Sequence, residues 1–507
     1  MKKALENRDF IVYRSIPDYI QNNRSSRLYL FLGLFVSVVQ FGIFKYCYPF
    51  PSFINGDSYV YITMASSNPK IGTYPIGYPM FLRLFSVFSK SDLVLVCFQY
   101  ALLQCGFLYF ILSIFSCFEV TKFTRVLFFV LFMINPVSWY LANMVSSDAL
   151  FLSLSIIWFT QLIWMVYSYH KGLILFNSIV LFILFTIRYN ALYYPLISIA
   201  ALFLNRAYIA KRVGGILISI FLIALFIQYT SKDYKRLSGV YQFSPFSGWQ
   251  LANNALYAYR YVDSFHLKKL PKKFDSIDKM VRHYFDTTKD TKKYPSEMLV
   301  ASTVYMWDPR SPLSIYADSL VAKDSTVGPL KKWSKAAPMM KEYGTQLIKT
   351  YPKEFVTHYI LPNSLKYYVP PIEFLETYNM GLDTVNPIAE EWFNYKTNKV
   401  YTRFKDKETY ILNYYPILVA VMNVLIVLNI LSFIGLRLQK RFPNIKKYLL
   451  LVGILWSINF CFSVFASPIA LRFQLFPIIV SLSLVIILME CLVVVSFEKH
   501  DVSTVIN

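Results

Sequence analysis

Long apolar runs recur along this chain of 507 residues, and they constrain its fold more than any other feature. Most of them reach the roughly 17–25 residues that an α-helix needs to cross a bilayer. The fifth and sixth runs are shorter, and a tilt or a re-entrant turn would accommodate them. The runs cover residues 28–48, 93–115, 126–142, 149–168, 173–187, 191–205, 215–231, 411–436, 448–466 and 478–497. The sequence therefore predicts an all-α polytopic membrane protein with about ten transmembrane helices.

Two segments between the runs are too long to be simple loops. Segment 49–92 holds two short aromatic-rich helical patterns, Tyr59–Ser66 and Met80–Phe88, of the kind that lies in the headgroup plane. Segment 232–408 is long enough for a hydrophobic core of its own, and we expect it to be mainly helical. The predicted organisation is an N-terminal transmembrane module 1–231, an extracytoplasmic domain 232–408 and C-terminal transmembrane helices 409–507.

Basic residues divide unevenly between the two sides of the predicted membrane. One side collects those before the first run, Lys171, and those at 122–125, 206–212 and 437–447, whereas the other short loops hold few. Because cytoplasmic loops are enriched in Lys and Arg, both termini are predicted to be cytoplasmic, with 49–92 and 232–408 outside. The net charge of +22 favours contact with anionic or phosphorylated lipids over nucleic acid.

The cysteines and histidines indicate neither a disulfide framework nor a metal centre. All six cysteines lie in or beside the apolar runs, and the five histidines are scattered without ligand spacing. A free cysteine in such a place is most often a small buried hydrophobe. No cofactor is predicted; a divalent metal is compatible with the sequence but not indicated.

Two carboxylates stand at predicted membrane boundaries, where ionisable residues are functional candidates. Asp57 follows the first run in Asn55-Gly56-Asp57-Ser58-Tyr59, ahead of the turn Tyr74-Pro75-Ile76-Gly77-Tyr78-Pro79. Asp148 opens the fourth run, after Ser146-Ser147. Each position also suits a helix N-cap, so capping and a chemical role are alternatives that do not exclude each other.

The layout of these motifs resembles the GT-C superfamily of polyprenyl-phosphate-sugar glycosyltransferases. It is most similar to the branch that holds the aminoarabinose transferases of lipid A and the protein O-mannosyltransferases, and it covers roughly the first 230 residues. The resemblance is carried by Gly56-Asp57-Ser58-Tyr59, Tyr74-Pro75-Ile76-Gly77-Tyr78-Pro79, Ser146-Ser147-Asp148-Ala149-Leu150-Phe151, Arg188-Tyr189 and Leu471-Arg472-Phe473.

The resemblance implies an inverting transferase at the outer face of the cytoplasmic membrane, in glycan biosynthesis of the cell envelope. The donor would be a sugar on a polyprenyl phosphate, undecaprenyl phosphate in a bacterium, and the acceptor a glycan, glycolipid or protein. Asp57 would be the base that removes the acceptor hydroxyl proton, and Asp148 would orient the acceptor or share its proton. Tyr59 and Tyr78, from the same motifs, are substrate-binding candidates. Family members often place a second acid directly after the first, whereas Ser58 follows Asp57 here, which weakens the case for a metal.

Arg188 and Arg472 are the candidates to bind the lipid phosphate. Each stands alone at the outer end of a run, and a guanidinium pairs with phosphate oxygens in a bidentate way. The alternative is an arginine that extends from a helix end to the headgroups. Lys70 and Arg83, near the Tyr-Pro turn, are weaker phosphate candidates.

Trp249 is the further candidate for sugar contact, in Gly248-Trp249-Gln250-Leu251-Ala252-Asn253-Asn254. An indole stacks on a sugar face and amide side chains bond hydroxyls, although an ordinary helix start with a buried tryptophan would look the same.

Other classes of function remain open. A flippase or transporter of lipid-linked sugars would also place arginines near a lipid phosphate, but it should show repeat symmetry or paired ionisable residues at mid-membrane depth. A polysaccharide polymerase would differ mainly in the size of its donor. A non-catalytic assembly protein would leave Asp57 replaceable.

Overall fold

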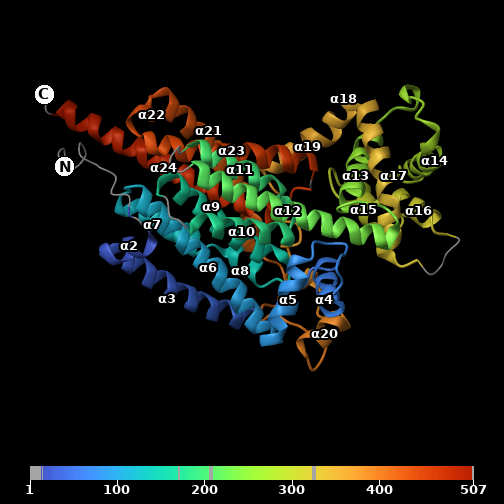
Figure 1. Cartoon of the computed structure of the whole chain (residues 1–507), viewed down its shortest axis with the longest axis horizontal. Helices are drawn as coiled ribbons and strands as arrows, with labels where there is room; N and C mark the ends of the chain where they lie inside the picture. The colour runs from blue at the N-terminus through green and yellow to red at the C-terminus, as the bar shows by residue number, and fades with distance from the viewer. Residues whose placement is uncertain are drawn as a thin grey trace.

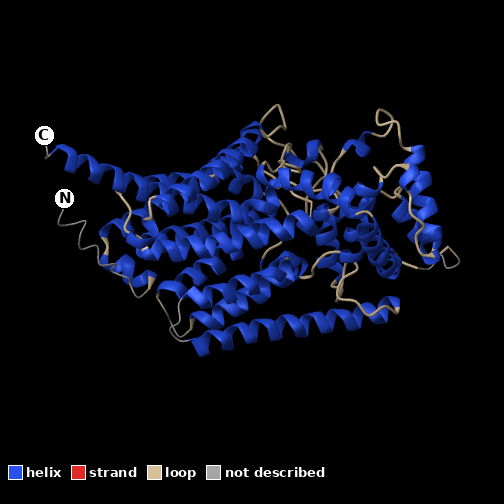
Figure 2. Cartoon of the chain, turned by 90° about the horizontal axis from the view of Figure 1, so that it is seen from above, coloured by secondary structure: helices blue, strands red, loops and turns tan. Residues whose placement is uncertain are grey.

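The computed structural model is built of helices wherever it describes the chain. The described residues are 13, 15–168, 172–204, 209–322, 327–466 and 468–504. Within these ranges no strand forms, and β pairing is limited to three isolated bridges. Long helices run side by side in one bundle, and a second group of helices lies beyond one end of it (Figures 1 and 2).

The bundle holds the helices that could cross a bilayer. It contains α3 (Arg24–Cys47), α6 (Asp92–Cys117), α7 (Lys122–Met133), α8 (Pro136–Ala142), α9 (Ser147–Tyr167), α10 (Leu173–Ile187), α11 (Tyr194–Leu204), α12 (Ile209–Ser238), α21 (Tyr415–Gly435), α23 (Pro443–Ala466) and α24 (Leu471–Thr504). Among the described residues, eight apolar helices are long enough to span a membrane when α7 and α8 count as one, and α10 and α11 are shorter. Within the described residues, the prediction of an all-helical protein with several helices able to cross a membrane is confirmed, and the count of ten spans stays a prediction.

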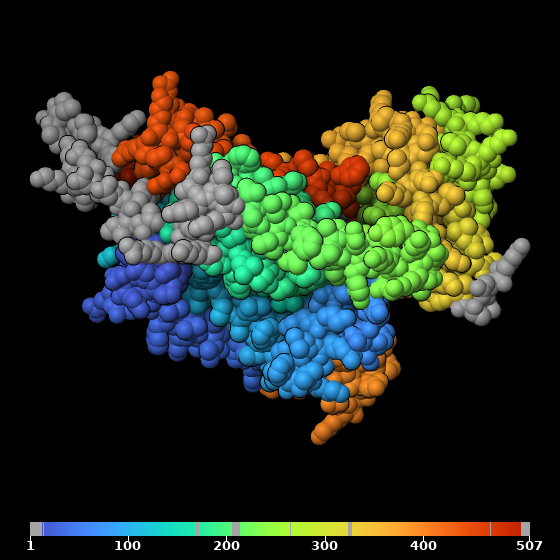
Figure 3. Space-filling view, in the orientation of Figure 1, coloured from blue at the N-terminus to red at the C-terminus, as the bar shows by residue number. Residues whose placement is uncertain are grey.

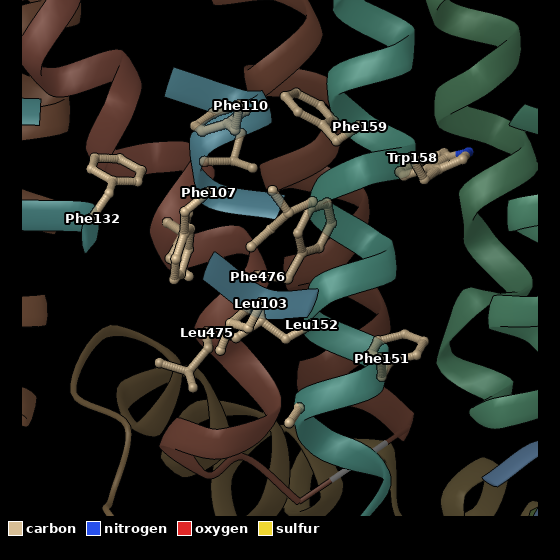
Figure 4. Packing of buried hydrophobic residues seen from close by; sticks show 14 of the residues in the cluster. Leu103, Phe107, Phe110, Phe132, Phe151, Leu152, Trp158, Phe159, Leu475 and Phe476 are labelled. Carbon is tan, nitrogen blue, oxygen red and sulfur yellow. The ribbon is translucent and has the colours of Figure 1, made fainter. Parts of the chain in front are cut away.

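The centre of the bundle is α9. Within the apolar window of α9, 89% of the residues are buried inside the protein, compared with 22% for α3 and α21 at the periphery. Aromatic side chains of α6, α9 and α24 interlock there, among them Phe107, Phe159 and Phe476 (Figure 4). A helix that is apolar all round belongs in such a core.

The third apolar run forms two helices instead of the single helix predicted over 126–142. Pro136 has no N–H to donate, so it cannot continue α7 and instead starts α8. The Asn135 side chain accepts from the Val137 amide at 3.1 Å and caps the new helix.

A buried carboxylate holds α24 in the part of the bundle that lies away from the second group of helices. Glu490, 8% exposed, accepts from the backbone amide of Thr121 at 2.8 Å and from its hydroxyl at 3.1 Å. It therefore caps the start of α7 and ties the two helices together.

The segment after α3 carries two short helices, α4 (Asp57–Ser67) and α5 (Gly77–Phe88), which contain the two predicted ranges. Both lie at the end of the bundle nearer to the second group of helices (Figure 1).

The second group has a core of its own. It contains α13 (Phe246–Tyr259), α14 (Asp275–Thr287), α15 (Val304–Trp307), α16 (Pro312–Ser319), α17 (Pro329–Thr350) and α18 (Pro352–Phe355). Buried side chains from Trp249 to Tyr359 form this cluster, which is separate from the core of the bundle. We call this group the outer domain. The surface is hollowed between it and the bundle (Figure 3).

The rest of segment 232–408 packs elsewhere. After α19 (Leu361–Tyr368), the chain returns to the bundle, and α20 (Pro387–Phe393) contacts α4. Leu375, Val385 and Phe393 belong to the core of the bundle. Segment 232–408 is thus divided between two hydrophobic cores.

Basic helix ends gather away from the outer domain. They are the start of α3 with Arg24, the start of α7 with Lys122, and α22 (Leu438–Arg441) (Figure 1). Part of the predicted charge distribution rests on residues 1–12, Arg14, Lys171 and Arg206, which lie outside the described residues.

Candidate active site

Four charged side chains, each at the end of a different helix, meet at the end of the bundle that faces the outer domain. Asp57 is the first residue of α4, and Asp148 is the second residue of α9. Arg188 directly follows α10, and Arg472 is the second residue of α24. The structure thus brings together the four residues that the sequence singled out as acids and phosphate ligands.

The four form one chain of ion pairs. Arg472 Nη2 lies 2.9 Å from Asp57 Oδ2, and its Nη1 lies 3.1 Å from Asp148 Oδ2. Arg188 Nη1 pairs with the other oxygen of Asp148. Two carboxylates and two guanidinium groups balance in charge, which is the condition for keeping such groups away from water.

Burial separates the inner pair from the outer pair. The side chains of Arg472 and Asp148 are 5% and 2% exposed, whereas those of Asp57 and Arg188 are 22% and 18% exposed. A substrate can therefore reach one carboxylate, Asp57, and one guanidinium, Arg188, from solvent, with the inner pair behind them. Arg472 Nε is buried without a hydrogen-bond partner among the described residues, so one donor is left for a ligand.

Neither carboxylate is a helix cap. The N-cap of α4 is Gly56, at φ 88°, a left-handed conformation that favours glycine. The N-cap of α9 is Ser146, whose hydroxyl donates to Asp148 Oδ2 at 2.9 Å. The capping alternative for Asp57 and Asp148 therefore does not hold, and both carboxylates are directed to the arginines instead.

Tyr74, the first residue of the Tyr-Pro turn motif, is a further member of the site that was not predicted. Its hydroxyl donates to Asp57 Oδ1 at 2.9 Å, so both oxygens of Asp57 are engaged. Burial, reinforced by the charge of Asp57, raises the pKa of Tyr74 and keeps its hydroxyl protonated as a donor.

Aromatic rings hold the two guanidinium groups in place. The Phe473 ring centroid lies 4.6 Å from the guanidinium carbon of Arg188 and 4.4 Å from that of Arg472. Phe374 contacts Arg472 from another side, at 4.7 Å. Cation–π contacts of this kind stabilise a charge without using its hydrogen-bond donors.

Segment 371–374 packs against Arg472 and the start of α24, and nothing in the sequence pointed to it. The Leu471 amide donates to the Pro371 carbonyl at 2.7 Å, and Phe374 has a positive φ of 68°. Burial raises the pKa of Glu373 against the opposing charges of Lys366 and Arg472. A strained residue and a carboxyl group that resists ionisation thus border the site.

The two tyrosine candidates lie outside the charged cluster. Tyr59 stacks on Phe53, with ring centroids 5.7 Å apart. Tyr78 is fully buried behind the cluster, and its hydroxyl donates to Gln99 at 3.0 Å. Burial raises the pKa of Tyr78, which suits a packing role.

The remaining candidates also lie elsewhere. Lys70 is exposed, and Arg83 donates to the Ala65 carbonyl at 3.1 Å, about 12 Å along α4 from Asp57. Arg83 thus caps the far end of α4. Trp249 is in the outer domain, 2% exposed, with Nε1 donating to the Trp333 carbonyl at 3.0 Å. Within the described residues, no group of three or more His, Cys, Asp or Glu could hold a metal ion.

Gly77 sets the spacing between α5 and the end of α10 that carries Arg188. A Cβ at Gly77 would lie 2.5 Å from the carbonyl carbon of Thr186. We expect Gly77→Ala to lower the free energy of unfolding by about 1–3 kcal/mol, because backbone cannot yield as a side chain can. Thermal unfolding in detergent measures this. Gly42→Ala is the control, since no atom lies within 4 Å of its Cβ position, and equal stability of the two variants would contradict the prediction.

No protein-family model, no curated protein and no solved structure matches the chain. A function for the cluster is therefore argued from its geometry.

Proposed function

We propose that this protein is an inverting membrane glycosyltransferase of the GT-C type that uses a polyprenyl-phosphate sugar. The observation that carries the proposal is the chain of ion pairs from Asp57 through Arg472 and Asp148 to Arg188. This chain of ion pairs joins a base that solvent can reach, Asp57, to two cations that suit a phosphate, Arg472 and Arg188. Both kinds of group are needed when a hydroxyl displaces a phosphate from a sugar.

Asp57 is the base of the proposed reaction. Its carboxylate takes the proton of the acceptor hydroxyl while the acceptor oxygen bonds to the anomeric carbon. The bond between that carbon and the phosphate oxygen breaks on the opposite face, so the configuration inverts. A hydroxyl is a poor nucleophile without such a base, which contributes about 10²–10⁴-fold to the rate.

The arginines stabilise the leaving group. The donor is a phosphodiester with one negative charge, and the polyprenyl phosphate that departs gains a second as the bond breaks. Arg188 and the unpartnered Nε of Arg472 are the donors available to it. The lipid tail would lie among the apolar helices beside them.

Donor binding and activation of the base are coupled in this scheme. Before the donor binds, Arg472 occupies Asp57 Oδ2. A phosphate that draws the guanidinium toward itself frees that oxygen to accept the hydroxyl proton. Asp148, which bonds both arginines, keeps them in place during the exchange and serves as the positioning acid.

The proposed setting is the cytoplasmic membrane, with ten spans and both termini inside. The described basic helix ends lie opposite the cluster, as cytoplasmic ends would. The cluster and the outer domain then face outward, where the acceptor would be a glycan, a glycolipid or a protein. The donor carries its phosphate on the lipid, so no nucleotide site is required.

Mass spectrometry of surface glycans and glycolipids tests this proposal. A strain without the gene is compared with the same strain complemented by wild type or by Asp57→Asn. We expect one sugar residue to disappear and only the wild type to restore it. Full restoration by Asp57→Asn would overturn the proposal and favour an assembly protein. Accumulation of the lipid-linked sugar on the inner leaflet would favour a flippase, and shortened polymers a polymerase.

A further inference from the structure

Three tryptophans of the outer domain line a pocket close to the cluster. Trp249 comes from α13, Trp307 from the end of α15 and Trp333 from α17. Trp333 is stacked on both of the others, with ring centroids 5.8 Å from Trp249 and 5.9 Å from Trp307. The pocket has a volume of about 210 Å³, and the polar residues Thr73, Ser314 and Lys332 line it as well.

The three indoles differ in what they offer a ligand. Trp249 is 2% exposed, and its N–H is used by the Trp333 carbonyl, so it supports the pocket from behind. Trp307 is 41% exposed, so part of its indole ring is open to a ligand.

The pocket adjoins the candidate base through one side chain. The Tyr74 ring lies 6.0 Å from the Trp307 ring, and the Tyr74 hydroxyl bonds Asp57 Oδ1 at 2.9 Å. Asp57 Oδ2, in contrast, bonds Arg472. The carboxylate therefore stands between the tryptophan pocket on one side and the arginines on the other.

We propose that the pocket binds a sugar ring of the acceptor glycan, stacked on Trp307. This rests on the proposed function and adds the substrate class, namely an acceptor that is itself a carbohydrate. One face of a sugar ring is lined with C–H bonds, which are attracted to the negative face of an indole. The hydroxyls at its rim meet Thr73, Ser314 and Lys332.

The position of the pocket identifies the acceptor and not the donor. An in-line displacement brings the acceptor oxygen and the leaving phosphate to opposite faces of the anomeric carbon. The arginines define the phosphate side, and the tryptophans lie on the other side of Asp57. The volume is below the roughly 300–1,000 Å³ of pockets for drug-sized ligands, so it accommodates one ring and not an oligosaccharide.

Saturation-transfer NMR on the purified full-length protein in lipid nanodiscs tests the pocket. The probes are methyl glycosides of glucose, galactose, mannose, N-acetylglucosamine and rhamnose. We expect at least one to give a signal with the wild type, and Trp307→Ala to weaken its apparent affinity by about tenfold or more. Trp307→Phe, which keeps a ring, should retain part of the affinity and shows that loss is not caused by misfolding.

The control is Phe265→Ala, because Phe265 is 92% exposed in the same domain and lies outside the pocket. It should bind as the wild type does. No signal from any glycoside with the wild type, or equal signals with Trp307→Ala, would overturn the proposal. Asp57→Asn should bind the glycosides normally. Failure of the pocket is therefore distinct from failure of the proposed function, which would appear as full transfer by Asp57→Asn.

Discussion

Sugar transfer by the Asp57→Asn variant is expected to fall by about 10²–10⁴-fold, with expression and membrane insertion unchanged. Asparagine keeps the shape of the side chain, and its oxygen can still accept from Tyr74, whereas its amide nitrogen cannot accept from Arg472. It cannot take a proton from a hydroxyl. Because the Asp57 side chain is 22% exposed and Arg472 keeps its pair with Asp148, the cost in folding should be smaller than that of removing Arg472.

The measurement is the rate of polyprenyl phosphate release from membranes that contain equal amounts of each variant. Asp92→Asn is the matched control. Asp92 also opens a helix after the first outer segment, but it accepts from Tyr395 at 3.0 Å and lies outside the cluster. Transfer at the wild-type rate by Asp57→Asn would contradict the assignment of the base, whatever Asp92→Asn does.

Replacement of Arg472 by leucine should have the largest effect on stability. It leaves Asp148, 2% exposed, with Arg188 alone, and it removes the ionic partner of Asp57. Removing one partner from a buried ion pair costs about 3–5 kcal/mol, because the remaining charge is unsolvated. We expect that loss in the free energy of unfolding, together with loss of transfer. Thermal unfolding in detergent and the release assay measure the two effects separately.

A second substitution distinguishes folding from chemistry. Asp57→Asn in the Arg472→Leu protein removes the carboxylate charge that has lost its ionic partner, so stability should recover in part while transfer stays absent. Arg236→Leu is the control for loss of a cation, since Arg236 is 74% exposed in its pair with Asp233 and such pairs contribute about 0–1 kcal/mol. Full transfer by Arg472→Leu would contradict the phosphate role of this arginine.

The convergence of the four charged residues could be predicted because helix ends and membrane sides are encoded locally. Apolar runs define the helices, and the distribution of basic residues places Asp57, Asp148, Arg188 and Arg472 at one end of the bundle. Their pairing could not be predicted in this way. A single arginine at a helix end looks the same whether it bonds a lipid phosphate or, as Arg472 does, two carboxylates.

Features that depend on contacts between distant segments were missed for the same reason. Tyr74 and segment 371–374 reach the cluster only through the packing of α4, α5 and α24. Amphipathic helices reveal that one face is buried but not against what, so the division of segment 232–408 between two cores had no signal in the sequence. Arg83 is a weak phosphate candidate in the sequence because the sequence shows its charge. The sequence does not show its hydrogen bond to the Ala65 carbonyl.

Helix α24 is anchored at two points, at Arg472 by the carboxylates and at Glu490 by the start of α7. The anchors are 18 residues apart, or about 27 Å along the axis. Held at its start and again at Glu490, α24 is not free to slide along its axis. In the proposed reaction, a lipid headgroup would therefore enter by rotation of side chains and by movement of segment 371–374, which contains Phe374. Turnover would then be limited by local motion of this segment and not by motion of the bundle. The helices of the bundle could stay rigid while substrates exchange.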